Sequence, residues 1–426
     1  MSKQKIIAGI DVGSSKIATI IGSKTDEEEE IKIIGVASIP SRGMRRGQIV
    51  DIEEATSGVI ESVEAAERMA GYNLSRVLVS IGGPHLASQN STGVVAVAEP
   101  EGEITFQDVE RVTDAARAIS LPSSREIIHV VPRFFTVDGQ AGIKDPVGMS
   151  GVRLEVETHI ITGSTTAIRN LTKCISEVGA NIEALVAGGL AAAESILTET
   201  EKELGVVLVD IGGGVTNIIV FVEGAPFYTS VLPIGAKNVT NDLAIGLRVS
   251  LETAEKIKIA LSKKEKEPAL PSEGKEDEIN LVDLGVSEEI KTVSRKTLVE
   301  GIIKPRLNEI FTMVDGEIKK SGAAGLTPAG VVICGGGAQT VGIIPAAKRN
   351  LAMPVRIGIP QKISGLIDDI QTPDFAVATG LLLYGGKKEL ESVTSSSLGQ
   401  IKKTLLKIPV RGMVDKVWGL LKSFLP

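Results

Sequence analysis

The strongest constraint on the fold is a glycine-tipped hairpin pattern that occurs twice in the sequence. Residues 6–21 form the first copy, in which an apolar run ends at Asp11 and a β-branched run follows a glycine-containing tip. Residues 206–220 form the second copy, and its Asp210 lies 199 residues after Asp11. Two apolar runs joined by a short glycine turn predict a β-hairpin. The repeat therefore predicts two similar lobes, each built around one hairpin.

The tips of the two hairpins have the composition of a phosphate site. A turn without side chains lets backbone N–H groups approach an anion closely. An aspartate beside such a turn repels phosphate unless a divalent cation lies between them, and magnesium in nucleotide sites keeps part of its water shell. A single glycine hairpin is more often a plain tight turn, but two matched copies with aspartate at the same place are hard to explain in that way. We therefore expect phosphate and magnesium between the lobes.

Length, composition and charge limit the class of protein. At 426 residues the chain exceeds a single hydrophobic core, so two or more domains are expected. Hydrophobic residues make up 43% of the chain and aromatic residues only 3%, which suits α/β layers. A net charge of −7 argues against nucleic acid as a partner, because phosphate backbones are bound by clustered Lys and Arg. Cys174 and Cys334 lie in apolar segments without metal-ligand spacing, so we expect buried, reduced thiols.

Four further segments bear on the organisation of the chain. The composition changes after a Gly-Gly-Pro sequence, and residues 84–162 are interpreted as a small α+β module inserted into the first lobe. Residues 188–196 predict a helix whose small residues permit close approach of backbones, as expected at a crossing between lobes, with an ordinary Ala-rich helix as an equal alternative. Residues 374–380 begin another small-residue helix, interpreted as its partner. Residues 330–338 predict a strand that opens into three glycines, against which a nucleotide's base and sugar can lie. Residues 240–259 predict one continuous helix.

The end of the chain predicts a membrane anchor. No apolar run reaches the roughly 18 residues that span a bilayer, and the N-terminus leads directly into a predicted strand, so we expect a soluble intracellular protein unless its surface holds it to a membrane. Residues 385–409 read as a polar linker, and residues 410–426 as an amphipathic helix with one apolar and one basic arc. Residues 401–426 carry six basic residues and one acidic residue, which favours anionic headgroups over the alternative of a helix docked on the protein's own core. The residues expected at the membrane are Val414, Lys416, Val417, Trp418, Leu421, Lys422, Phe424 and Leu425.

These features, in this order, resemble the actin-like ATPase superfamily, which includes Hsp70 chaperones and sugar kinases. Within it the chain is similar to the FtsA family of bacterial cell-division proteins over nearly its whole length. Residues 197–206 and 238–244 look like that family, as do the inserted module and the terminal helix. The resemblance implies an α/β, two-lobed actin-like (ribonuclease H-like) ATPase fold with an inserted small α+β subdomain and a C-terminal amphipathic helix.

The resemblance also implies a division into subdomains. Subdomain 1A would comprise residues 1–83, 163–203 and 363–384, and subdomain 1C residues 84–162. Subdomain 2A would comprise residues 204–236 and 303–362, and subdomain 2B residues 237–302. The linker (385–409) and the membrane-targeting helix (410–426) would follow.

The resemblance assigns roles to residues that match the family's motifs. Two phosphate loops, a ribose-contacting Glu-x-x-Lys pair and an adenosine turn are implied. The implied nucleotide-binding residues are Gly13, Ser14, Ser15, Lys16, Gly212, Gly213, Gly214, Thr216, Asn217, Glu255, Lys258, Gly335, Gly336 and Gly337. Asp11 and Asp210 would hold magnesium through water. For Glu255 and Lys258, an exposed helical pair one turn apart remains the alternative.

Two departures from the superfamily pattern bear on hydrolysis. Asn217 stands where phosphate loop two often has an aspartate, so a charge that could organise magnesium or water is missing. Gly188 and Gly189 stand where active ATPases often have a Glu or Gln that orients the attacking water. Without a general base, we expect at most slow ATP hydrolysis and no assigned catalytic residue.

The resemblance implies an ATP-binding cell-division protein that self-assembles on the inner face of the cytoplasmic membrane at the division site. It would act in septum formation by tethering filaments of FtsZ, the tubulin-like division GTPase, through residues 237–302. Other divisome proteins would bind the inserted subdomain, and anionic lipids the C-terminal helix. The alternatives are a pilus-assembly adaptor of the same fold, and a small-molecule kinase or ATPase, which would need a carboxylate base in the cleft.

Overall fold

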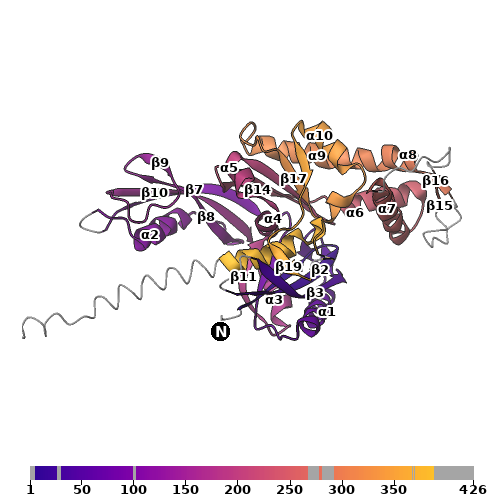
Figure 1. Cartoon of the computed structure of the whole chain (residues 1–426), viewed down its shortest axis with the longest axis horizontal. Coiled ribbons are helices and arrows are strands. Elements are labelled where there is room, and N and C mark those ends of the chain that lie inside the picture. Colours follow the sequence, from indigo (N-terminus) through magenta and orange to yellow (C-terminus); the bar gives the residue numbers. More distant parts are fainter. Residues whose placement is uncertain are drawn as a thin grey trace, which may run out of the picture. The chain divides into compact units, whose positions relative to one another are not determined.

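The computed structural model describes residues 5–25, 30–98, 102–266, 278–280, 292–366, 368 and 370–387. Residues up to Leu383 belong to one compact unit, and of a second unit, which begins at Tyr384, the structure describes only the helical residues 384–387. The first unit contains three main sheets (Figure 1). Each sheet has its own cluster of buried apolar side chains.

The first lobe is built on a six-stranded sheet with the strand order β11-β6-β1-β2-β3-β19. Its strands are β1 (Lys5–Val12), β2 (Lys16–Lys24), β3 (Ile31–Pro40), β6 (Arg76–Ile81), β11 (Asn181–Ala187) and β19 (Ile363–Gly365), and a small hairpin of β4 (Met44–Arg45) and β5 (Gln48–Ile49) follows β3. Helices α1 (Ile52–Ala70) and α3 (Thr165–Ser176) pack their apolar faces into this core. Asp51 caps α1 by accepting hydrogen bonds from its first backbone N–H groups, and Gly71 ends it in the left-handed conformation with φ 68°.

The second lobe is built on a five-stranded sheet with the order β14-β13-β12-β17-β18. Its strands are β12 (Val206–Ile211), β13 (Thr216–Val222), β14 (Ala225–Leu232), β17 (Val331–Cys334) and β18 (Val355–Ile357). Its helices are α6 (Ala236–Leu247), α7 (Leu251–Lys266), α8 (Arg295–Leu298), η2 (Val299–Ile303), α9 (Lys304–Lys320), η3 (Gly336–Gln339) and α10 (Ile343–Leu351), and β15 (Glu278–Asn280) pairs with β16 (Thr292–Ser294). The prediction of one helix over 240–259 is wrong, because the chain turns at Arg248, whose φ of 55° is left-handed. Both cysteines are free and buried, as predicted.

The two hairpins share hydrogen bonds and register. In the first, Gly13 N donates to Lys16 O over 3.0 Å, and in the second Gly212 N donates to Val215 O over 2.9 Å. The parallel neighbours also match, since β1 pairs with β6 and β12 with β17, and the run β6-β1-β2-β3 corresponds to β17-β12-β13-β14. The internal repeat predicted from the sequence is therefore present in the structure.

The inserted subdomain has a four-stranded sheet with the order β7-β10-β8-β9. Its elements are β7 (Ala87–Ala96), α2 (Phe106–Arg117), β8 (Arg125–Val137), β9 (Gln140–Ile143) and β10 (Arg153–Ser164), which lie together at one side of Figure 1. Thr105 and Asp108 form a reciprocal capping box at the start of α2. Ile104, Val112 and Leu154 are among the side chains of its own core.

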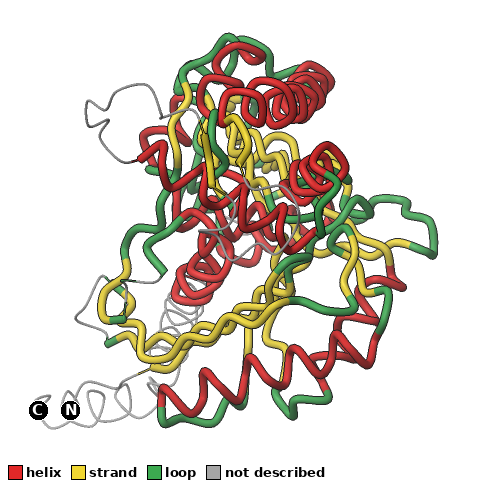
Figure 2. The backbone as a smooth tube through the Cα atoms, turned by 90° about the vertical axis from the view of Figure 1, so that its right-hand side faces the viewer, coloured by secondary structure: helices red, strands yellow, loops and turns green. Residues whose placement is uncertain are grey.

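Two helices of small residues lie side by side where the chain passes between the lobes. They are α4 (Gly188–Ile196) and residues 376–383, which follow the 3₁₀ turn η4 (Pro373–Phe375). A Cβ added to Gly380 would lie 1.8 Å from Ala191 O, so only glycine allows this backbone contact. Ser195 Oγ donates to Ala376 O over 2.7 Å. These two contacts confirm the predicted close approach of the backbones. Figure 2 shows the layers in its lower half, where helices (red) lie above and below the strands (yellow).

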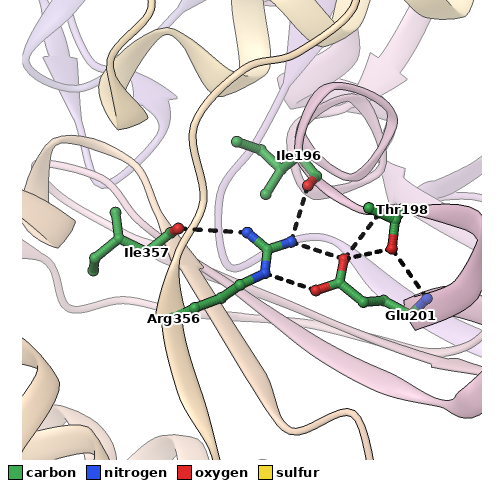
Figure 3. Close-up of polar contacts among 5 residues, drawn as sticks. All are labelled: Ile196, Thr198, Glu201, Arg356 and Ile357. Atoms are coloured by element: carbon green, nitrogen blue, oxygen red, sulfur yellow. Dashed lines mark hydrogen bonds and ion pairs between the residues drawn. The ribbon is translucent and has the colours of Figure 1, made fainter.

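A guanidinium fork fixes the segment that leads into the second hairpin. Arg356 on β18 donates from Nε and Nη2 to the two carboxylate oxygens of Glu201 on α5 (Glu199–Leu204), both over 2.7 Å. Arg356 Nη2 also donates to Ile196 O at the end of α4 over 3.1 Å (Figure 3). Glu201 in turn accepts from Thr198, which caps α5. Burial alone would raise the pKa of Glu201, but these donors hold it below its usual value.

The predicted membrane residues, 414–425, and nearly all of the predicted linker lie outside the described residues. Within the described ranges, no helix combines the length and apolar character needed to cross a bilayer.

Candidate nucleotide site

A cavity of about 770 Å³ lies where the two hairpins, the third glycine turn and the helices α6 and α7 meet. Pockets of this size hold cofactor-sized ligands. Most of the predicted site residues line it: Asp11, Gly13, Ser14, Ser15, Lys16, Asp210, Gly212, Gly213, Asn217, Glu255, Lys258, Gly335, Gly336 and Gly337. Gly214 and Thr216 are not among the lining residues. Thr216 is fully buried and its hydroxyl donates to Ile234 O over 2.9 Å.

The tips of the two phosphate loops touch each other. A Cβ on Gly213 would lie 2.8 Å from Ser15 Cβ, and a Cβ on Gly214 would lie 2.8 Å from Ser14 Oγ. Lys237, at the start of α6, reaches across the same gap and donates from Nζ to Ser14 O over 2.7 Å. The glycines therefore serve the contact between lobes as well as the exposure of backbone N–H groups.

Two carboxylates face the cavity from equivalent strand ends. Ser80 Oγ donates to Asp11 Oδ1 over 2.6 Å, and Asn217 Nδ2 donates to Asp210 Oδ2 over 2.7 Å. Burial raises the pKa of both aspartates. The pKa of Asp210 reaches about 6, and the charge of Asp11 contributes to that rise. A cation between two neighbouring carboxylates offsets their repulsion and favours their ionised forms.

The donor set suits magnesium held mainly through water. Among the described residues, no group of three or more His, Cys, Asp or Glu side chains is arranged to hold a metal ion. Two carboxylates with space around them fit magnesium, which keeps several of its waters, better than an ion that demands a full protein cage. Asn217 Oδ1 is buried and has no hydrogen-bond partner within the described part of the chain, so it offers an acceptor to such a water.

The third glycine turn packs on the second hairpin. Gly335 has a φ of 80°, and a Cβ there would lie 2.3 Å from Asp210 Oδ1. A Cβ on Gly337 would lie 2.4 Å from Ile211 Cγ2, whereas at Gly336 the nearest atom is 3.7 Å away. Two of the three glycines thus make room for strand β12 and its carboxylate, and Gly336 is the one with free space beside it.

Glu255 and Lys258 are not an exposed helical pair. Lys258 is only 8% exposed, and its Nζ donates to Glu255 Oε2 over 2.8 Å and to Thr240 Oγ1 over 3.0 Å. Thr240 Oγ1 donates to Glu255 Oε2 over 2.5 Å. The pair is therefore tied to α6 and lines the cavity, where a hydroxyl-bearing ligand can meet both charges.

Sequence reasoning missed a cluster around Lys16 that also lines the cavity. Lys16 Nζ forms an ion pair with Asp374 Oδ2 at 2.5 Å and lies 3.4 Å from the centre of the Phe375 ring. Gln339 Nε2 donates to Asp374 Oδ1 over 2.9 Å. Burial opposes ionisation of Asp374, but Lys16 lowers its pKa below the usual value. The only signal in the sequence was that Asp374 opens a helix of small residues, which does not identify Lys16 as its partner.

The start of α4 offers no general base. Gly188 is the α4 residue that lines the cavity, and the side chain nearest to it is Asn217. The prediction of slow hydrolysis stays a prediction. Sequence reasoning also missed Lys237 and Ser80, whose roles depend on contacts between distant segments.

Two family models match the chain. The model described as "SHS2 domain inserted in FTSA" matches residues 83–162, and the model described as "Cell division protein FtsA" matches residues 207–380. Proteins named cell division protein FtsA are similar over most of their length. The protein of Pseudomonas aeruginosa is 38% identical over 399 residues, which cover 93% of each chain, and that of Escherichia coli K12 is 35% identical over 416 residues, covering 94% of this chain and 97% of its own.

Solved structures with a similar fold are more distant in sequence. One is a type IV pilus biogenesis complex, PilM–PilN, with a TM-score of 0.61 at 16% identity, covering 89% of this chain and 98% of its own. Another is MreB5 of Spiroplasma citri bound to ADP, with a TM-score of 0.52 at 13% identity, covering 93% and 98%. These likenesses concern the fold alone. Together with the inserted-domain match they confirm the predicted two-lobed actin-like fold with an inserted subdomain.

Proposed function

Because the chain belongs to the FtsA family of bacterial cell-division proteins, we propose that it binds ATP and magnesium in the cavity between its lobes and tethers FtsZ filaments to the membrane. It assembles with copies of itself on the cytoplasmic face of the membrane at the division site. The pilus-adaptor alternative rests only on a shared fold at 16% identity. The FtsA relatives are 38% and 35% identical in sequence to this chain, more than twice that value.

The observation that carries nucleotide binding is the matched pair of hairpins. Their tips meet, and Asp11 and Asp210 face one cavity. In our proposal the glycines of both loops would hold the phosphates, and Asp11 and Asp210 would hold magnesium through water. The ribose meets Glu255 and Lys258, and adenosine lies near Gly336. Magnesium neutralises phosphate charge when it is bound, and the chain's own residues orient the ligand and exclude water.

ATP acts mainly as a bridge between the lobes in this proposal. A ligand that contacts both phosphate loops favours the arrangement in which the loops touch. The absence of a carboxylate at Gly188 supports slow hydrolysis rather than a kinase that turns over a small molecule. MreB5, a fold neighbour, has been solved with ADP and with AMPPNP, which supports an adenine nucleotide here.

The remaining contacts are assigned by the family and by the sequence. We propose that residues 410–426 bind anionic lipid, that FtsZ binds residues 237–302, and that other divisome proteins bind the inserted subdomain at 84–162. The subdomain limits predicted above are proposed with them. The amphipathic pattern, with Trp418 and Phe424 on the apolar arc and lysines opposite, supports the lipid contact.

Liposome co-sedimentation tests the proposal. The full chain and a chain truncated after Gly399 are mixed with anionic or neutral vesicles, with and without ATP and magnesium. We expect only the full chain to sediment, only with anionic vesicles, and in larger amount with ATP. FtsZ is then added, and we expect it to sediment with the full chain alone. If both chains stay in the supernatant, the membrane role is wrong, and a screen for phosphoryl transfer becomes the next experiment.

A further inference from the structure

The inserted subdomain is covalently part of the first lobe but packs on the second. It enters the chain between β6 and α3, yet its edge strand β7 lies beside β14, the edge strand of the second sheet (Figure 1). Ser88 on β7 meets the backbone of β14 twice: Ser88 Oγ donates to Thr229 O over 2.9 Å and accepts from Thr229 N over 2.9 Å. The subdomain therefore spans the two lobes.

A ring of hydrogen bonds with one direction links these strands. Asn90 Nδ2 donates to Phe227 O over 3.2 Å, so Asn90 Oδ1 faces His159 Nδ1, 2.8 Å away. Since an amide oxygen can only accept, Nδ1 carries the proton and Nε2 is the acceptor. Thr229 Oγ1, which lies 2.9 Å from Nε2, must then donate to it. Each group donates to the next in one direction, from Thr229 on β14 to His159 on β10, then to Asn90 on β7, and back to Phe227 O on β14.

His159 is suited to keep these hydrogen bonds in a single arrangement of donors and acceptors. It is fully buried, and burial, with smaller effects from the charges of Arg133 and His129, lowers its pKa to about 3. It stays neutral at physiological pH, so both hydrogen bonds keep their directions. Arg133 adds a contact on the same junction, because its guanidinium lies 4.7 Å from the centre of the Phe227 ring.

The junction connects directly to the nucleotide cavity on both sides. β14 pairs with β13, and Leu232 lies opposite Thr216, which begins β13 and directly follows the cavity-lining Val215. On the other side, His129 on β8 accepts a hydrogen bond from Ala187 N over 3.0 Å, and Ala187 directly precedes the cavity-lining Gly188. A rotation of one lobe against the other would change the distances across the junction.

We propose that Asn90, His159 and Thr229 form a latch that couples closure of the nucleotide cavity to the position of the inserted subdomain. The inference rests on the proposed function, because it names how ATP regulates a surface outside the cavity. The structure that contains the latch also has the two phosphate loops in contact, so both belong to one arrangement of the lobes. A ligand that bridges the loops then stabilises the hydrogen bonds of the latch. By reciprocity, an intact latch raises the affinity of the chain for that ligand.

Thr229→Val in the full chain is the primary test. Valine keeps the shape of threonine but leaves His159 Nε2 without a donor in a buried site. From the usual cost of an unpaired buried acceptor, we expect affinity for ATP–magnesium to fall roughly five- to a hundredfold. Hydrogen–deuterium exchange is measured in parallel. We expect ATP–magnesium to slow exchange in β7 and β14 of the unmodified chain and to have little effect in the variant.

Two further variants separate a latch from a general loss of folding. Asn90→Ala removes an exposed side chain, so the fold is retained, and we expect it to behave like Thr229→Val. Thr92→Val makes the same chemical change on an exposed position of β7 and should leave affinity and exchange unchanged.

The outcomes distinguish the two proposals. If the unmodified chain binds ATP but both latch variants bind it equally well, and exchange in β7 and β14 does not respond to ATP, the latch is refuted while the proposed function stands. If the unmodified chain does not bind ATP, the proposed function fails, and the coupling fails with it.

Discussion

Replacing Asp210 by Asn should stabilise the metal-free protein at neutral pH. The carboxylate is 5% exposed, and burial, with the charge of Asp11 beside it, raises its pKa from 3.8 to about 6. A rise of roughly two pKa units corresponds to about 3 kcal/mol of unfavourable ionisation in the folded state. Asparagine does not ionise, and its Oδ1 can still accept the hydrogen bond from Asn217.

The sign of the pH dependence follows from proton uptake. Between pH 4 and 6 the folded chain holds the Asp210 proton more tightly than the unfolded chain, so the contribution of Asp210 to stability falls as pH rises. Above about pH 6 the penalty is constant. We therefore expect Asp210→Asn to match the unmodified protein near pH 4 and to exceed it by up to about 3 kcal/mol above pH 6.

Urea unfolding followed by far-ultraviolet circular dichroism, in buffer with EDTA, measures this difference at each pH. Asp108→Asn is a control for which we expect the opposite effect on stability. Burial opposes the charge of Asp108, but Thr105 and Arg111 bind it and lower its pKa to about 2, so its loss should destabilise at neutral pH. A benefit from Asp210→Asn that is the same at pH 4 and pH 8, or a loss at every pH, would refute the electrostatic reasoning. With ATP and magnesium added, the unmodified protein should gain more stability than the variant.

Three further changes test other contacts. Lys258→Met should weaken ATP binding roughly tenfold in calorimetry, because a buried charged donor is lost, whereas Lys256→Met, outside the cavity lining, should not. Arg356→Lys should cost about 1–3 kcal/mol in thermal unfolding, because lysine cannot make the fork, and Arg68→Lys, in an exposed pair, should cost little. His159→Gln should make the free energy of unfolding less sensitive to acid. Below pH 6.5 the histidine of the unfolded chain takes up a proton, whereas buried His159 stays neutral in the folded chain. The free energy of unfolding of the unmodified protein therefore falls by about 1.4 kcal/mol per pH unit down to about pH 3.

The sequence predicted what depends on local pattern. The two hairpins and the small-residue helices were found because glycine and β-branched residues at fixed spacing have few structural solutions. The break at Arg248 was missed because a left-handed non-glycine residue has no signature in the apolar period.

The site was predicted only in part. The carboxylates and phosphate loops were found because their motif repeats. The Lys16–Asp374 ion pair and the reach of Lys237 to Ser14 join residues far apart in sequence, and no pattern in a single sequence encodes such pairs. The latch was missed for the same reason, since Asn90, His159 and Thr229 lie on three strands of two sheets.

The way β7 meets β14 also bears on unwanted association. An edge strand offers unpaired backbone groups to any other strand, which makes it a starting point for aggregation. Here three such groups of β14, namely Phe227 O, Thr229 N and Thr229 O, are satisfied by the side chains of Ser88 and Asn90. Because side chains rather than a continuous backbone ladder cover the edge, the inserted subdomain can move away by releasing a few bonds. Each time the inserted subdomain separates from the second lobe, the edges of two sheets are exposed at once. Conditions that favour this separation should therefore also favour aggregation of the protein.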